Sequence, residues 1–150
     1  MPGRTESGLS VVRKVVGYVV REEQLVVFTH DDVPLEITGV QVPAGTIEPG
    51  ETPEDAVVRE VLEETGVNAR IVKALGVELH DARLKKPEIH ERHFFHLEPV
   101  DDQTPERWPG GESDASDGSE PQSWTCFWIP LEQSQVLCAG FGAKLGQIAF

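Results

Sequence analysis

Residues Gly45 to Val67 read GTIEPGETPEDAVVREVLEETGV, a stretch in which turn-forming residues give way to a run of helix formers. Thr52 is a favourable N-cap, Pro53 suits the first helical position, and Gly66 favours a left-handed exit from a helix. These start and stop signals predict a helix from Pro53 to Thr65.

The predicted helix has one aliphatic side and one acidic side. An α-helix turns by about 100° per residue, which places four aliphatic residues on one side and three glutamates on the other. The aliphatic residues are Val57, Val58, Val61 and Leu62, and the glutamates are Glu60, Glu63 and Glu64. The like charges of Glu60 and Glu64, four residues apart, cost an isolated helix roughly 0.2–0.5 kcal/mol. A bound cation would reverse that cost. Mg²⁺ suits such a site because it prefers carboxylate oxygens and shares its coordination shell with water and substrate phosphates.

A glutamate-rich helix face is usually just solvated, because charged side chains face water. This stretch, however, fits every specified position of the pattern G-x5-E-x7-R-E-U-x-E-E-x-G-U, in which U is aliphatic. The matching residues are Gly45, Glu51, Arg59, Glu60, Val61, Glu63, Glu64, Gly66 and Val67. The chain therefore resembles a Nudix (MutT-like) hydrolase, on a motif that occupies residues 45–67 of its 150.

The resemblance implies a Nudix-type α/β/α sandwich with a central mixed sheet, and hydrolysis of a diphosphate bond with Mg²⁺ or Mn²⁺. It implies that Glu60 and Glu64 are metal ligands. Glu63 would be a further ligand or the base that orients water, and the carbonyl of Gly45 would complete the metal shell.

The resemblance also implies a supporting residue and a general base, but it specifies them less closely than the metal ligands. Arg59 would support the site by pairing with an acidic side chain such as Glu51, although an ordinary surface ion pair is the alternative. Family members do not all take the general base from the motif, so a later loop is a second source. The candidates there are Glu106, Glu112 and Glu120, each typical of a solvated loop, and we favour Glu112.

Some residues outside the motif are candidate substrate contacts. A terminal phosphate would suit three basic residues in a predicted turn, Arg83, Lys85 and Lys86, although such a turn more commonly has no such role. Trp108 is the candidate for stacking on a base, whereas Trp124 and Trp128 share a strand face and are expected in the core.

Three histidines lie close together in the sequence, at His90, His93 and His96. On a strand the odd spacing places His93 on the opposite face from the other two. We therefore expect solvated or hydrogen-bonded histidines and no convergent zinc site.

The order of elements predicts an α/β fold with a mixed sheet between helices. Strands are expected at Val11–Val20, Gln24–Thr29, Ile37–Val42, Ala69–His80, Ile89–Glu98 and from Ser123 onward. Pro43 and Gly45 are expected to end the third of these runs. A final helix is expected from Leu131 to Ile148, weakened by its glycines.

The chain is expected to form a single domain over residues 1–150, with a mobile acidic insertion at 101–122. That segment contains PGGESDASDGSEPQ, which is rich in Gly, Ser and acidic residues and has almost nothing to bury.

Composition limits the partners and the compartment. The formal net charge of −13 argues against binding long nucleic acids, but a small nucleotide can arrive as a metal complex. Cys126 and Cys138 lack CxxC spacing, which favours reduced thiols and a cytoplasmic location. No apolar run approaches the roughly 20 residues needed to span a bilayer. Whether the chain forms a homodimer is left open.

The expected function is metal-dependent hydrolysis of the diphosphate bond in a nucleoside diphosphate linked to another group. An ADP-ribose or nucleotide-sugar type is favoured, because VPAG at Val42–Gly45 resembles the entry to the motif in pyrophosphatases of that class. The alternatives are a nucleoside triphosphate or dinucleoside polyphosphate hydrolase, and a non-catalytic nucleotide-binding module. A calcium-binding protein is disfavoured, because the chain lacks a D-x-[DN]-x-[DN]-G loop.

Overall fold

A computed structural model describes residues 3–4, 10–30, 40–82, 87–101, 104–112, 122–136, 144 and 148. Its strands are β1 (Gly3–Arg4), β2 (Ser10–Arg21), β3 (Gln24–His30), β4 (Ala44–Thr46), β5 (Ala69–Asp81), β6 (Glu88–Pro99), β7 (Arg107–Glu112) and β8 (Gln122–Pro130). Its helical elements are α2 (Pro53–Thr65) and the 3-10 helix η1 (Leu131–Val136).

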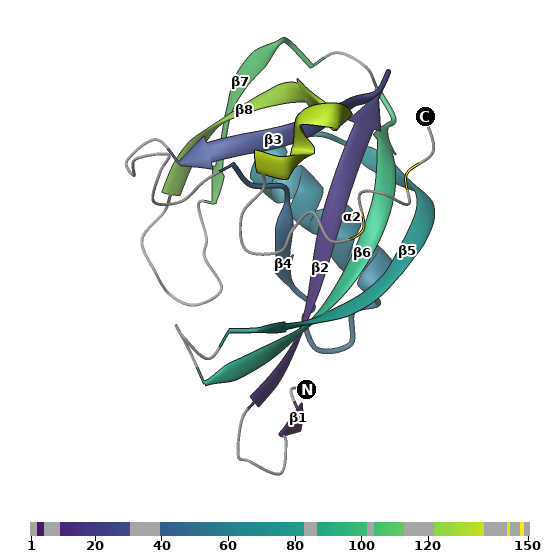
Figure 1. Ribbon diagram of the computed structural model, residues 1–150, viewed down its shortest axis with the longest axis vertical. Helices are drawn as coiled ribbons and strands as arrows, with labels where there is room; N and C mark the ends of the chain where they lie inside the picture. The colour runs from purple at the N-terminus through teal and green to yellow at the C-terminus, as the bar shows by residue number, and fades with distance from the viewer. Residues whose placement is uncertain are drawn as a thin grey trace.

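The strands form one mixed sheet in the order β5-β6-β2-β3-β8-β7, and β1 and β4 also pair with β2. β2 and β6 are parallel, whereas the other pairings are antiparallel. β2 therefore joins the two parts of the sheet, and it runs through the middle of the molecule (Figure 1). The expected α/β class and mixed sheet are confirmed.

The bounds of α2 agree with the local signals in its sequence. The side chain of Thr52 accepts a hydrogen bond from the Asp55 N–H at 3.1 Å, and Pro53 opens the helix. Gly66 adopts a φ of 73°, and its N–H donates to the Leu62 carbonyl at 2.8 Å. Each end of the helix is thus capped by residues that lie within one turn of that end.

α2 packs against one face of the sheet, behind β2 and β6 in the view of Figure 1. Val57 and Val61 are buried there in a cluster that includes Val15, Val19, Val26, Phe95 and Leu97. The expectation that Leu62 shares this packing side is wrong, because its side chain is 49% exposed. The helix is rotated so that part of its acidic side faces the protein, and this rotation turns Leu62 toward solvent.

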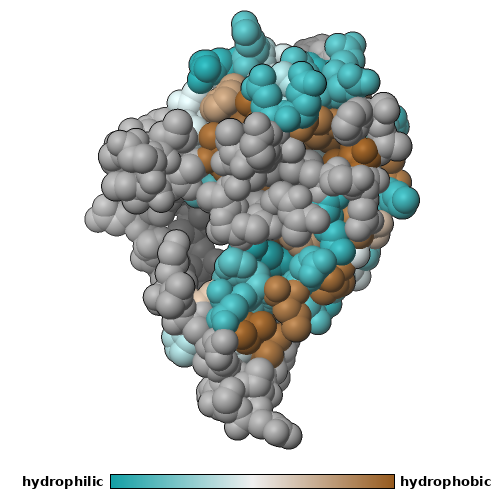
Figure 2. Space-filling model, in the orientation of Figure 1, coloured by the Kyte–Doolittle hydropathy of each residue, from teal (hydrophilic) through white to brown (hydrophobic). Residues whose placement is uncertain are grey.

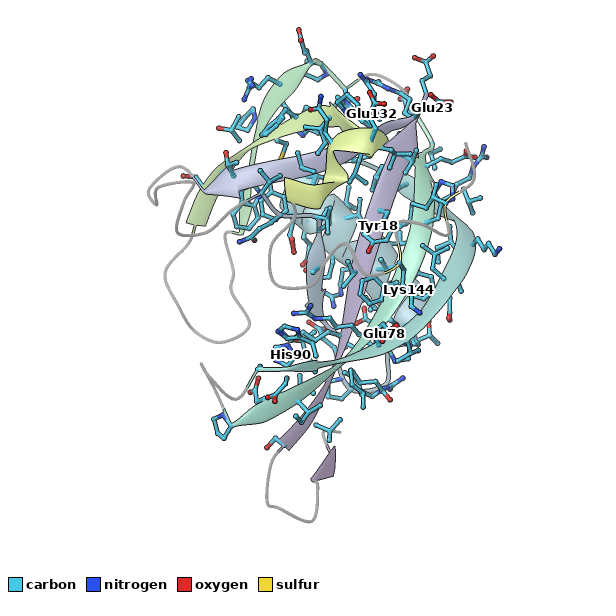
Figure 3. The ribbon with its side chains drawn as sticks, in the orientation of Figure 1. Tyr18, Glu23, Glu78, His90, Glu132 and Lys144 are labelled. Carbon is cyan, nitrogen blue, oxygen red and sulfur yellow. The ribbon has the colours of Figure 1, made fainter. Side chains whose placement is uncertain are left out.

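The opposite face of the sheet carries a second buried cluster, which includes Val16, Tyr18, Leu75 and Phe94. Tyr18, Glu78 and Lys144 lie together on this face (Figure 3). Lys144 binds Glu78 with Nζ 2.9 Å from Oε1, and its backbone N–H donates to the Tyr18 hydroxyl at 3.3 Å. Burial raises the pKa of Tyr18 above its ordinary value, so this hydroxyl stays protonated.

Residues 37–39 of the strand expected at Ile37–Val42 lie outside the described residues, so this expectation stays a prediction. In the described part, Gln41 forms an antiparallel bridge with Phe28. Regular pairing begins after Pro43, in β4, so Gly45 lies within a strand and does not end one. Sequence signals missed β4 because its three residues are paired by β2, which is distant in the chain.

The expected insertion at 101–122 contains a strand. β7 pairs with β8 in a register that runs from Arg107 opposite Phe127 to Glu112 opposite Gln122. Residues 102–103 and 113–121 lie outside the described residues, and the expected mobility stays a prediction. The expected final helix begins as η1, and most of the chain beyond Val136 is likewise outside the described part.

The end of the molecule near the β2–β3 turn is polar. Hydrophilic residues gather there in Figure 2, and Figure 3 labels Glu23 and Glu132 in the same region. Among the residues that the structure describes, no helix is long and apolar enough to cross a membrane.

The packing of α2 can be tested by comparing one substitution on its buried side with one on its exposed side. Val61→Ala should lower the free energy of unfolding by about 2 kcal/mol, since it removes two fully buried methyl groups and leaves a cavity. Leu62→Ala, one residue along the same helix, should cost less than about 1 kcal/mol because the side chain is half exposed. Urea unfolding of both variants measures the difference. Equal costs would contradict the observed rotation of the helix.

Candidate functional site

The candidate site forms where β4 meets α2. β4 pairs with β2, which places Gly45 opposite Val15. A Cβ atom on Gly45 would overlap the carboxyl group of Glu60. A side chain at this position would therefore displace the Glu60 carboxyl group from its place beside the strand backbone.

Glu60 and Glu64 are both buried, with exposed fractions of 8% and 5%. Burial raises the pKa of Glu60 above its ordinary value, and Arg59 and a hydrogen bond with the Glu64 side chain offset this increase only in part. The Ala44 N–H lies 3.4 Å from each carboxyl oxygen of Glu64. Two adjacent carboxyl groups that are removed from water favour either a shared proton or a bound cation.

Arg59 ties the glutamates to the loop before the helix. It donates to both oxygens of Glu51, from Nε at 2.7 Å and from Nη2 at 2.9 Å. Nη2 also donates to the Thr46 carbonyl at 3.1 Å, while Nη1 donates to Glu60 at 2.8 Å and to Glu63 at 3.1 Å. The expected pairing of Arg59 with Glu51 is thus observed, in a two-pronged geometry that fixes the guanidinium plane.

The charges of this network stabilise one another. Hydrogen bonds from Arg59 lower the pKa of Glu51, although partial burial opposes the shift. The same bonds raise the pKa of Arg59, so it remains a cation at all ordinary pH values.

Two carboxylates of the site are suited to bind a cation. In the described part of the chain, no group of three or more His, Cys, Asp and Glu side chains is gathered as a metal cluster. The side chain of Glu63 is 54% exposed and is bound to Arg59 in this arrangement. Glu60 and Glu64 remain as a pair, which suits Mg²⁺ because this ion is commonly held by one or two carboxylates together with water and phosphate oxygens.

Two tryptophans contact the C-terminal end of α2. The Trp124 Nε1–H donates to the Glu64 carbonyl at 2.9 Å, and the Trp108 Nε1–H donates to the Thr65 carbonyl at 2.7 Å. Trp124 is buried, as expected, whereas Trp108 lies on β7 with its ring 6.2 Å from that of Trp128. No local spacing in the sequence links either tryptophan to the helix, so these contacts were not predicted.

Other candidates from the sequence lie at the margin of this site or beyond the described residues. Glu112 ends β7, a strand that contacts α2, but its side chain is outside the described part. Glu106 is exposed just before β7. Four candidates lie outside the described residues: Arg83, Lys85, Lys86 and Glu120.

The histidines follow the alternation of their strand. His90 Nε2 lies 2.9 Å from Glu88, and His93 Nε2 lies 3.2 Å from Glu91. Burial lowers the pKa of His90 and of His96, so both favour the neutral form. Each of the two pairs joins residues two apart on β6, and the pairs lie on opposite faces of the sheet.

Comparisons with known proteins identify relatives of the chain. The model of the NUDIX domain family matches residues 11–144. A protein named putative 8-oxo-dGTP diphosphatase, from Bacillus subtilis (strain 168), is 38% identical over 74 residues, or 49% of this chain and 43% of that protein. An RNA pyrophosphohydrolase from Psychrobacter sp. (strain PRwf-1) is 33% identical over 104 residues, or 62% and 59% of the two chains.

A solved structure shares the fold. The MutT protein from Methanosarcina mazei Go1 superposes with a TM-score of 0.63 at 18% identity, over 91% of each chain. The matched region spans less than two thirds of the length of either relative compared by sequence.

The Arg59–Glu51 pair predicts a pH-dependent contribution to stability. Glu51→Gln should lower the free energy of unfolding at pH 7 by about 1.5–3 kcal/mol, because it weakens hydrogen bonds to a charged partner. The folded-state pKa of Glu51 lies below its ordinary value of 4.5. The wild-type advantage should therefore be complete above about pH 4.5 and should disappear as the pH falls through the folded-state pKa.

Chemical unfolding of both proteins between pH 3 and pH 7 measures this difference. Glu54→Gln, which alters an exposed carboxylate in the first turn of the same helix, is the control and should show a much smaller effect. A Glu51→Gln deficit that does not change with pH would contradict the assignment.

Proposed function

This chain belongs to the NUDIX domain family, and we propose that it is a metal-dependent hydrolase that cleaves a diphosphate bond in a nucleotide. The observation that carries the proposal is the burial of Glu60 against Gly45 together with the burial of Glu64, whose carboxyl group lies near the Ala44 N–H. A module that only binds nucleotides has no need to desolvate two like-charged groups, so we favour catalysis over the non-catalytic alternative.

Glu60 and Glu64 are the proposed ligands of Mg²⁺ or Mn²⁺. A divalent cation between them would polarise the phosphoryl group and lower the pKa of an attacking water molecule. The carbonyl of Gly45 is a further candidate ligand. Burial raises the pKa of Glu60 and so disfavours its charged form, whereas a bound cation would favour that form.

Arg59 and Glu63 have distinct proposed roles. Arg59 keeps Glu60 in place from one side, through the bond at 2.8 Å, and Glu51 in turn orients Arg59. Glu63, which is half exposed, is free to leave Arg59 for a water molecule or a metal ion. Glu63 and Glu112 are therefore the two candidates for the general base that accepts the proton of the attacking water.

The proposed substrate is a nucleoside diphosphate linked to another group, with ADP-ribose first and nucleotide sugars next. The motif acts only on the diphosphate, so selectivity must come from other residues. VPAG at Val42–Gly45 supports this class. Trp108, Arg83 and Lys85 are the proposed contacts for the base and for the distal group.

A second candidate is hydrolysis at a triphosphate end. It is favoured by the names of the two relatives compared by sequence, which refer to 8-oxo-dGTP and to RNA. A net charge of −13 disfavours RNA, because the protein lacks the general attraction that a long polyanion requires. A free triphosphate, carried as a metal complex, is not subject to that argument.

Metal dependence follows directly from the carboxylate pair. Glu64→Gln should reduce kcat at least about 100-fold, equivalent to about 2.7 kcal/mol of activation free energy, while leaving the protein folded. Excess EDTA should abolish hydrolysis by the wild type, and added Mg²⁺ should restore it.

Steady-state rates, together with thermal unfolding of each protein, test this assignment. Glu54→Gln removes a carboxylate from the exposed start of the same helix and should leave kcat unchanged. Full activity of the Glu64→Gln variant, or of the wild type in EDTA, would exclude the proposed metal site.

The substrate class is decided by comparing kcat/KM values. We expect ADP-ribose to exceed nucleoside triphosphates, 8-oxo-dGTP and diadenosine polyphosphates by at least about tenfold, or about 1.4 kcal/mol. A preference of the same size for a triphosphate would establish the second candidate instead. RNA that carries a 5′-triphosphate belongs in the same panel.

A further inference from the structure

Strand β5 forms an edge of the sheet and is exposed along most of its length. It pairs with β6 on one side, and no strand in the described part of the chain pairs with its other side. Most of its 13 residues are exposed, and it lies at the margin of the molecule in Figure 1. A long edge strand presents unpaired N–H and C=O groups, which can bind a further strand.

The large exposed apolar side chains of the described residues gather around this strand. Val72, Val77 and Leu79 lie on β5 and are 49%, 47% and 70% exposed. The two others are Leu62, on the helix that contacts β5, and Val100, directly after β6. Single apolar residues on a surface need no explanation, but a group of them along one unpaired strand indicates a surface that binds another protein.

The pairing of β5 with β6 is irregular, and the irregularity decides which side chains share a face. The register shifts at two points, and Leu75 is the extra residue at one of them. Lys73 and Glu78, five residues apart, would point to opposite faces of a regular strand. Because Leu75 is skipped between them, they lie opposite His96 and Arg92 of β6, and so on the same face.

This register makes β5 complementary to a second copy of itself. In the ladder of β5–β6 pairs, Lys73 lies two positions before Gly76, and Glu78 lies two positions after it. If two copies of β5 pair antiparallel about a two-fold axis at Gly76, Lys73 of each copy faces Glu78 of the other. Opposite charges would thus meet at two symmetry-related places on this face.

The other face of β5 is complementary in the same register. Ala74 and Val77 lie one ladder position from Gly76, on either side of it, and Ile71 and Leu79 lie three positions away. The two-fold axis therefore places Ala74 against Val77 and Ile71 against Leu79. Apolar side chains would meet on this face, so both faces of the strand suit a second copy of the chain.

Lys73 and Glu78 are available for this contact. Lys73 is exposed and has no ion-pair partner among the residues that the structure describes. Glu78 binds the Nζ of Lys144 at 2.9 Å, but its side chain is 49% exposed and can accept a second cation. A lysine on an edge strand commonly opposes pairing with other chains. Here it opposes only registers that place it against itself, and it favours the one centred on Gly76.

We propose that this protein forms a homodimer in which two copies of β5 pair antiparallel about a two-fold axis at Gly76. The interface continues the sheet from one copy into the other. The net charge of −13 on each copy opposes association, but at physiological ionic strength exposed charges more than about 8 Å apart are largely screened. This inference is independent of the proposed function, because it uses no residue of the carboxylate site.

Sedimentation equilibrium of the full chain measures the Kd of the dimer. We expect a Kd below about 100 µM for the wild type. Lys73→Glu should raise it at least about tenfold, because glutamates would then face each other at both places. Arg107→Glu makes the same change in net charge at an exposed position on β7, the opposite end of the sheet. This control should leave the Kd within about threefold of the wild type, because its charge is distant from β5.

A mixture of two charge-reversed chains tests the register itself. Glu78→Lys alone should also raise the Kd at least about tenfold, because lysines would then face each other. In a mixed dimer of Lys73→Glu with Glu78→Lys, each place regains one positive and one negative side chain. An equimolar mixture should therefore dimerise with a Kd within about threefold of the wild type, whereas either variant alone is mainly monomeric.

Three results would overturn the proposal. The first is a wild type that stays monomeric up to about 500 µM. The second is a dimer that tolerates Lys73→Glu, since another surface would then form it, and the third is a mixture that does not dimerise. Lys73→Glu removes no ion pair within the described residues, so it decides the matter even if Glu78→Lys, which loses the bond to Lys144, does not fold.

Discussion

Two carboxyl groups of α2, on Glu60 and Glu64, are buried side by side, and the rest of the site is arranged around the cost of burying them. Charged groups that are removed from water require compensation by opposite charge, hydrogen bonds or protonation. Arg59 supplies the positive charge to Glu60, and the raised pKa of Glu60 indicates that the compensation is incomplete. In the proposed function, a divalent cation would complete this compensation, and the incomplete compensation would favour its binding.

Steric constraints on the backbone follow from this burial. Because Gly45 has no side chain, the Glu60 carboxyl group can occupy the space beside β4. The same condition recurs at the end of the helix, where Gly110 leaves room for the Glu64 carbonyl and the indole of Trp124. Strands therefore approach helix α2 closely at the Glu60 carboxyl group and at the Glu64 main-chain carbonyl. Groups placed on a helix between strands can be held more precisely than groups on loops.

The net charge of the molecule and the buried carboxylates of the site affect a negatively charged ligand in different ways. A net charge of −13 repels polyanions in general, whereas the buried carboxylates of the proposed site would act on a phosphate only through a cation. Recognition of the proposed nucleotide substrate would then depend on short-range contacts. The described residues provide aromatic groups near the end of the helix, where Trp108 lies beside Trp128 and Arg21 lies over the Trp128 ring at 4.1 Å.

The sequence by itself determined the helix, the motif and most strands. Thr52 and Gly66 act within one turn of the helix ends, and strand alternation depends on neighbours two residues apart, so both are encoded locally. Only the tertiary structure decided that Glu60 and Glu64 are buried, that β4 and β7 are strands, and that two indoles end the helix. Those indole bonds join residues 43 and 60 positions apart. Contacts at that separation depend on how strands pair, which local spacing does not specify.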